Sequence, residues 1–131
     1  MGIANFFSGD VKVNYAADFF YYPDAFVTCD GRDRSDRYVK RYPKLIAEVI
    51  SASTEDFDQG TKFTDYQNIS TFEEYVLIAQ DNIHVECFRR CPDDSTQWDK
   101  TSYGKGDIIL LDSIHLKLSV QALYRGVMNN T

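Results

Sequence analysis

Two acidic residues lie within or beside apolar segments, in a pattern that indicates a metal-binding site. Glu48 interrupts the nearly continuous apolar run at 44–50, where a carboxylate is costly unless a neighbouring charge or a bound cation compensates it. Asp24 follows Pro23 at the start of the preceding apolar segment. If the two segments are neighbouring strands, both carboxylates meet at one end and can hold Mg²⁺, or Mn²⁺ in its place. Such an ion polarises a phosphate and lowers the pKa of an attacking water.

A site of this kind also needs a cation near the attacking water or the developing negative charge, and Lys62 is the candidate. It lies on the helix predicted directly after the strand of Glu48. Each of the three residues has a plainer interpretation. Asp58 and Lys62 are four apart, in the order that favours a surface ion pair. Glu48 could pair with a neighbouring side chain, and Asp24 could be a turn residue after the proline.

A basic cluster lies between the two apolar segments. Its members are Arg32, Arg34, Arg37, Lys40, Arg41 and Lys44, with only Asp33 and Asp36 as acids among them. The four arginines are candidates to contact DNA phosphates, whereas a solvated surface loop explains the same run. The whole chain carries a formal charge of −6, which opposes binding of a polyanion over its entire surface.

Length and composition indicate one soluble domain that spans residues 1–131. Hydrophobic residues make up 44% of the chain and aromatic residues 15%, enough for one ring-rich core. No apolar run is long enough to span a bilayer, and the first residues lack the pattern of a secretion signal. Three cysteines, an odd number, suit free thiols in a reducing compartment. We therefore expect a cytoplasmic protein.

Cys87 and Cys91, with His84 nearby, raise the alternative of a zinc-binding module. The alternation along 84–88 places His84 and Cys87 on opposite faces of a strand, and no paired ligand motif follows. A structural role for these cysteines is the favoured interpretation.

The segments around the candidate residues predict strands and one central helix. Alternation predicts strands at 11–15 and 19–29, the second with Pro23 at an irregular or edge position. A polar loop covers 30–42. The run at 44–50 suits a strand that is buried on both faces.

Hydroxyl and acidic residues at 51–56 predict the start of a helix that runs from about residue 55 or 56 to 68. Its buried stripe consists of Phe63, Tyr66 and Ile69. Strands are predicted at 74–79, 83–90, 97–103, 107–111 and 114–118, followed by a short helix at 120–124. The pattern is that of an α/β domain with a strand-rich C-terminal half.

Four of these segments together resemble a known family. They are the stretches 20–30 and 42–54, the spacing Asp58–Lys62–Tyr66 on the helix, and the strand at 74–78. In this combination, over about residues 11–127, the chain resembles the "putative restriction endonuclease" family that is greatly expanded in cyanobacteria.

The resemblance implies the restriction-endonuclease-like PD-(D/E)XK nuclease fold, which is a mixed β-sheet flanked by helices. It makes Asp24 and Glu48 the acids of the first and second motifs, and it implies Mg²⁺-dependent hydrolysis of DNA phosphodiesters. The usual lysine two residues after the second acid is absent here, where Ile50 stands. Lys62 matches the lysine that the family carries on the neighbouring helix.

The pattern of the family also includes a helix and strands that precede the part matched here. Without such elements one face and one edge of the sheet would be exposed, so we expect a homodimer, with exchanged elements as one possible form. The same consideration keeps open a catalytically inactive, truncated nuclease-fold protein that acts as a binding or assembly module.

Overall fold

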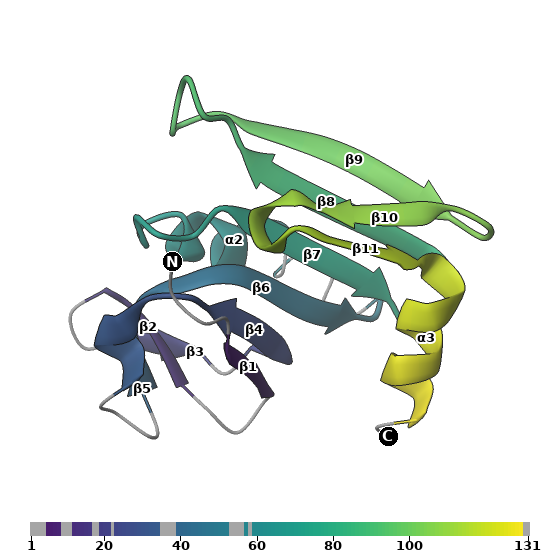
Figure 1. The fold of residues 1–131 in the computed structure, drawn as a ribbon, viewed down its shortest axis with the longest axis horizontal. Helices are drawn as coiled ribbons and strands as arrows, with labels where there is room; N and C mark the ends of the chain where they lie inside the picture. Colours follow the sequence, from purple (N-terminus) through teal and green to yellow (C-terminus); the bar gives the residue numbers. More distant parts are fainter. Residues whose placement is uncertain are drawn as a thin grey trace.

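A six-stranded mixed sheet runs through the centre of the protein (Figure 1). The computed structural model describes residues 5–8, 12–16, 19–21, 23–34, 39–52, 57 and 59–129. The strands follow the order β1 (Asn5–Ser8), β4 (Ala25–Thr28), β6 (Pro43–Ile50), β7 (Glu74–Ala79), β8 (His84–Arg90) and β9 (Trp98–Gly104). β6 and β7 pair in parallel, whereas the other neighbours are antiparallel. The predicted mixed-sheet α/β fold is thus confirmed.

Shorter elements cover the two faces of this sheet. One face carries helix α2 (Thr61–Tyr66) and the three-stranded sheet of β3 (Phe19–Tyr21), β2 (Lys12–Ala16) and β5 (Val39–Lys40). The other carries the hairpin of β10 (Ile108–Leu111) and β11 (Leu116–Ser119) and helix α3 (Val120–Asn129). In Figure 1, α2 lies behind the sheet and the hairpin lies in front of it. No helix within the described ranges is both long and apolar enough to cross a membrane.

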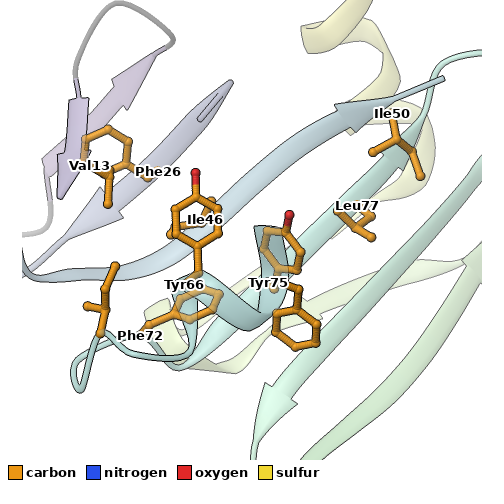
Figure 2. Packing of buried hydrophobic residues seen from close by; sticks show 10 residues of the cluster. Val13, Phe26, Ile46, Ile50, Tyr66, Phe72, Tyr75 and Leu77 are labelled. Carbon is orange, nitrogen blue, oxygen red and sulfur yellow. The ribbon is translucent and has the colours of Figure 1, made fainter. Parts of the chain in front are cut away.

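Strand alternation divides the buried side chains between two cores. On β6, Ile46 and Ile50 point towards α2, whereas Leu45 points towards the hairpin. The core on the α2 side is rich in rings, contributed by Phe26, Tyr66, Phe72 and Tyr75 (Figure 2). Phe63 also belongs to it. The core on the hairpin side is mostly aliphatic, with Val27, Leu45, Val76, Ile78, Val85, Ile109, Leu111 and Val120. We call these the aromatic core and the aliphatic core.

The aromatic core holds α2 in place. This helix has only six residues, too few for a stable helix in isolation. The ring of Phe63 lies 4.9 Å from that of Tyr75 and 5.0 Å from that of Trp98. Phe63 and Tyr66 are buried as predicted, and Ile69 is buried just beyond the end of the helix. Tertiary packing, rather than helix propensity, therefore positions the side chains of α2.

The predicted single strand at 19–29 was wrong. It forms two strands in different sheets, with β3 paired to β2 and β4 in the central sheet. Pro23 lies between them, where its fixed φ and missing N–H end the ladder. The break turns the chain from one sheet to the other and leaves Asp24 directly before β4.

Other boundaries also differ from the sequence prediction. The predicted loop at 30–42 contains the 3-10 turn η1 (Gly31–Arg34) and the short strand β5. A second 3-10 turn, η2 (Asp112–Ile114), precedes β11. Helix α3 runs well beyond residue 124. The predicted helix start at 55 or 56 lies outside the described residues, although Phe57 and Gln59 are helical.

Candidate functional site

Glu48 is buried on the α2 face of β6, and the amine of Lys62 meets it there. Alternation places Glu48 between Ile46 and Ile50 on that face, and the residue is 3% exposed. Lys62 extends from α2, and its Nζ donates a 2.8 Å hydrogen bond to Glu48 Oε2. The lysine side chain is 11% exposed. The structure thus joins two of the three predicted site residues in a buried ion pair.

Asp24 reaches the same place from β4. The antiparallel pairing of Ala25 with Ala47 sets Asp24 beside the position of Glu48. Its Oδ2 accepts a 2.7 Å hydrogen bond from the backbone N–H of Val49, and its side chain is exposed. The two carboxylates therefore lie at one end of neighbouring strands, one buried and one open to solvent.

The donor set fits a hard divalent cation. Mg²⁺ takes oxygen ligands and commonly uses one or two carboxylates while it keeps several waters. Glu48 and Asp24 supply two carboxylates, and Asp24 is accessible to a hydrated ion. Within the described residues no group of three or more His, Cys, Asp or Glu side chains is arranged to hold a metal ion.

The ring of Tyr21, on β3, lies beside Lys62. The lysine amine lies 5.5 Å from the centre of the tyrosine ring, within range of a cation–π contact. The Tyr21 hydroxyl donates a 2.7 Å hydrogen bond to Asp65. Burial and, next, this hydrogen bond raise the pKa of Tyr21 above its ordinary value. The phenol therefore stays neutral and keeps its place beside the amine.

Glu86 is a third acid on this face, and the sequence analysis did not single it out as a site residue. In the strand register Glu48 pairs with Leu77, and Leu77 pairs with Glu86. Glu86 is 6% exposed. It forms an ion pair with Lys100 and accepts a 3.1 Å hydrogen bond from Gln59 Nε2. Alternation along β8 gives the face of Glu86, but its alignment with Glu48 depends on which strands pair.

A hollow of about 310 Å³ lies at the end of β6 and β7, next to this row. Ile50 and Leu77, both visible in Figure 2, contribute apolar side chains from neighbouring strands. Its lining is Ile50, Ser51, Ala52, Leu77, Ala79, Asp81, Asn82, His84 and Glu86. Because Leu77 is the cross-strand neighbour of Glu48, the hollow begins one strand spacing, ~4.8 Å, from the candidate site.

The basic cluster lies at the opposite end of β6. Arg32 donates to Asp30 through two nitrogens, at 3.0 and 2.6 Å, and its guanidinium lies 3.6 Å from the centre of the Tyr42 ring. The span from Pro43 to Glu48 along an extended strand is ~16 Å. The structure therefore does not bring Arg32 to the carboxylates. Its side-chain hydrogen bonds to Asp30 lower the pKa of that acid to about 2.

Some other members of the basic cluster make hydrogen bonds within the loop, and others lie outside the residues that the structure describes. Lys40 is buried and donates to the carbonyl of Asp33. The carboxylate of Asp33 accepts backbone N–H bonds from Arg41 and Tyr42. Arg41 is exposed, whereas Arg37 and the side chain of Arg34 lie outside the described residues.

Cys87 lies on the other face of β8, in the aliphatic core. Burial raises the pKa of its thiol to about 12, which suits an inert structural cysteine. His84 lines the hollow on the opposite face. The two residues thus point away from each other, as their alternation predicted.

Comparison with a solved structure defines the class of fold. The chain aligns with the crystal structure of "a putative nuclease belonging to DUF820" from Anabaena variabilis, with a TM-score of 0.72 and 17% sequence identity. The alignment covers 94% of this chain and 69% of that chain. The fold is therefore shared with this protein across nearly the whole chain.

The sequence matches the model of the Uma2 family, described as "Putative restriction endonuclease", over residues 1–122, and the chain belongs to this family. Among its relatives are two uncharacterized proteins of Synechocystis. Slr1290 is 35% identical over 105 residues, covering 80% of this chain and 54% of the relative. Sll1609 is 35% identical over 96 residues, covering 70% and 52%. The chain spans about half the length of these curated relatives.

Proposed function

We propose that the protein is a Mg²⁺-dependent endonuclease that hydrolyses DNA phosphodiester bonds. The observation that carries this proposal is the ion pair between Lys62, on α2, and the buried Glu48, at the strand end where Asp24 arrives from β4. Membership of the restriction endonuclease family supports it.

The chain's own residues have distinct roles in this proposal. Asp24 and Glu48 would hold the ion, which supplies a polarised phosphate and a more acidic water when bound. Lys62 orients Glu48 and compensates its charge through their 2.8 Å hydrogen bond. The amine also lies where it can orient the attacking water and stabilise the negative charge that develops on the phosphate.

The decisive measurement is cleavage of supercoiled plasmid with Mg²⁺ or Mn²⁺. We expect the wild type to nick the plasmid, and both Glu48→Ala and Lys62→Ala to lose that activity. Glu73→Ala is a matched control, since Glu73 is exposed just before β7 and pairs with Lys44 rather than with a residue of the site. Equal activity in all four proteins would reject the catalytic assignment. No cleavage by any of them would favour the inactive binding or assembly module.

For DNA contact we propose the basic cluster, and in particular the exposed Arg41. Duplex DNA binding measured at rising salt tests this, because each lost phosphate contact lowers the salt dependence of the affinity. An Arg41→Ala variant whose salt dependence equals that of the wild type would remove Arg41 from the interface.

We also propose a homodimer. The β10–β11 hairpin exposes three large apolar side chains, Ile108, Leu110 and Leu116, and such surface favours association. Size-exclusion chromatography at micromolar concentration should show a dimer, and a clean monomer would overturn this proposal.

A further inference from the structure

The hollow beside Glu48 combines apolar walls with one buried acceptor. Leu77 and Ile50 provide the apolar part, and Glu86 provides the carboxylate. His84 stands at its rim with a side chain that is 45% exposed. The volume, about 310 Å³, is at the small end of the range for small-molecule sites. This combination suits a flat ring that has hydrogen-bond donors on one edge.

Three side chains surround the Glu86 carboxylate. Gln59 donates to its Oε1, Lys100 pairs with its Oε2, and His84 Nε2 lies 4.0 Å from Oε1, beyond hydrogen-bond distance. A carboxylate has about four lone-pair sites, so these contacts leave capacity for a further donor. An ionised carboxylate only accepts hydrogen bonds, and it therefore distinguishes a ring edge with an amino group from one with a carbonyl oxygen.

The position of the hollow relative to the ion pair connects it to the proposed reaction. Leu77 separates Glu48 from Glu86 in one cross-strand row, so a phosphate at Glu48 would have its own base within reach of the hollow. A base inside a duplex cannot enter such a site unless it leaves the stack.

We propose that the hollow takes an unpaired nucleobase that carries an exocyclic amino group, with Glu86 accepting a hydrogen bond from that amino group. The inference rests on the proposed function, since it assigns the substrate class of the same site. It makes single-stranded or locally unpaired DNA the preferred substrate. His84 borders the base at the rim, where an aromatic ring can stack on it.

Deoxycytidine and deoxythymidine homopolymers test the proposal, because their bases present an amino group and a carbonyl oxygen at the same ring position. Binding of each polymer is measured by fluorescence anisotropy, with Ca²⁺ in place of Mg²⁺ in the buffer. We expect the wild type to bind the deoxycytidine polymer about tenfold more tightly. Glu86→Gln should bring the two affinities within about twofold, because an amide can donate as well as accept. Glu73→Gln, the matched control, should keep the wild-type ratio.

A second variant tests the hollow without changing the buried Glu86. Ala52→Trp places a large ring into the hollow from an exposed position, and it should weaken binding of the deoxycytidine polymer about tenfold. Equal affinity of the wild type for both polymers would overturn the proposal, as would a preference that survives in both variants.

Plasmid cleavage by the same preparations separates this inference from the proposed function. Cleavage without a base preference would reject the base site and leave the nuclease standing. A base preference without cleavage would support the base site and reject the nuclease.

Discussion

Both faces of the central sheet bury glutamates, and Glu74 on one face and Glu48 on the other have different surroundings. On the aliphatic side Glu74 is 0% exposed. Its Oε1 accepts from the backbone N–H and the hydroxyl of Ser113, and its Oε2 accepts from Arg89. On the aromatic side Glu48 meets a lysine from a short helix, beside the exposed Asp24. The donors around Glu74 serve the fold, whereas under the proposed function Glu48, beside a second acid, serves the chemistry.

The largest expected effect separates the two glutamates by activity. Glu48→Gln keeps the size of the side chain but removes the charge that pairs with Lys62 and that, under the proposed function, would hold the cation. We expect plasmid cleavage to fall about 10³-fold, equivalent to ~4 kcal/mol of transition-state stabilisation. Folded Glu74→Gln should cleave within about threefold of the wild type. Similar losses in the two variants would erase the functional difference between the faces.

The second effect separates them by stability. Glu74→Gln places an amide N–H₂ among buried donors, and it removes the charge that compensates Arg89. We expect the free energy of unfolding in urea to fall by about 3 kcal/mol. Glu73→Gln, one residue earlier and exposed, should change it by less than about 0.5 kcal/mol. A Glu74→Gln protein as stable as this control would show that the closed set of donors contributes little to the fold.

A third, smaller effect tests how the aliphatic side supports the hollow on the other face. The Tyr124 hydroxyl, on α3, accepts from the His84 N–H and lies 2.7 Å from the carbonyl of Ala79. It therefore ties α3 to the β7–β8 turn, which also lines the hollow. Tyr124→Phe should cost about 1–2 kcal/mol of unfolding free energy. It should also speed amide hydrogen exchange in that turn, and unchanged exchange there would remove the link between the two faces.

The smallest effect lies at the far end of β6 and depends on pH. The Asp30 pKa is lowered from 3.8 to about 2 by its hydrogen bonds from Arg32. The folded state therefore binds this proton less well than the unfolded state, and the contribution to stability is present above about pH 4 and is lost as the pH falls towards 2. Chemical denaturation from pH 7 to 2 should show that wild type and Asp30→Asn converge in acid. A difference that stays constant across this range would contradict the assignment.

The sequence was informative where one residue conflicts with its surroundings. Glu48 stands out because an acid interrupts an apolar strand, and the structure places that acid in a buried ion pair. The plainer partner for Lys62, Asp58, lies outside the described residues. Glu86 had no comparable signal, because alternation on β8 gives its face but only the β6–β7–β8 register aligns it with Glu48.

The sequence was least informative where a side chain pairs with a residue that cannot be inferred from spacing, or where a break in the backbone changes the sheet to which a strand belongs. The density of arginines indicated a basic cluster. It did not show that Arg32 would donate hydrogen bonds to Asp30, or that Asp33 would accept backbone hydrogen bonds from the end of the loop. Pro23 was interpreted as an irregularity within one strand, whereas it separates two sheets. In each case the outcome depends on which groups meet across the fold.

The parallel pairing of β6 and β7 has a consequence for the folding pathway. The segment that connects these strands includes α2. Lys62, the partner of Glu48, therefore lies on the crossover connection that must form before β7 can pair with β6. Closing a long crossover is entropically unfavourable before its contacts form, and burying Glu48 earlier would strand its charge. If the ion pair forms as β7 pairs with β6, losing it raises the free energy of that step. We therefore expect Lys62→Ala to refold more slowly than the wild type, in addition to impairing the site.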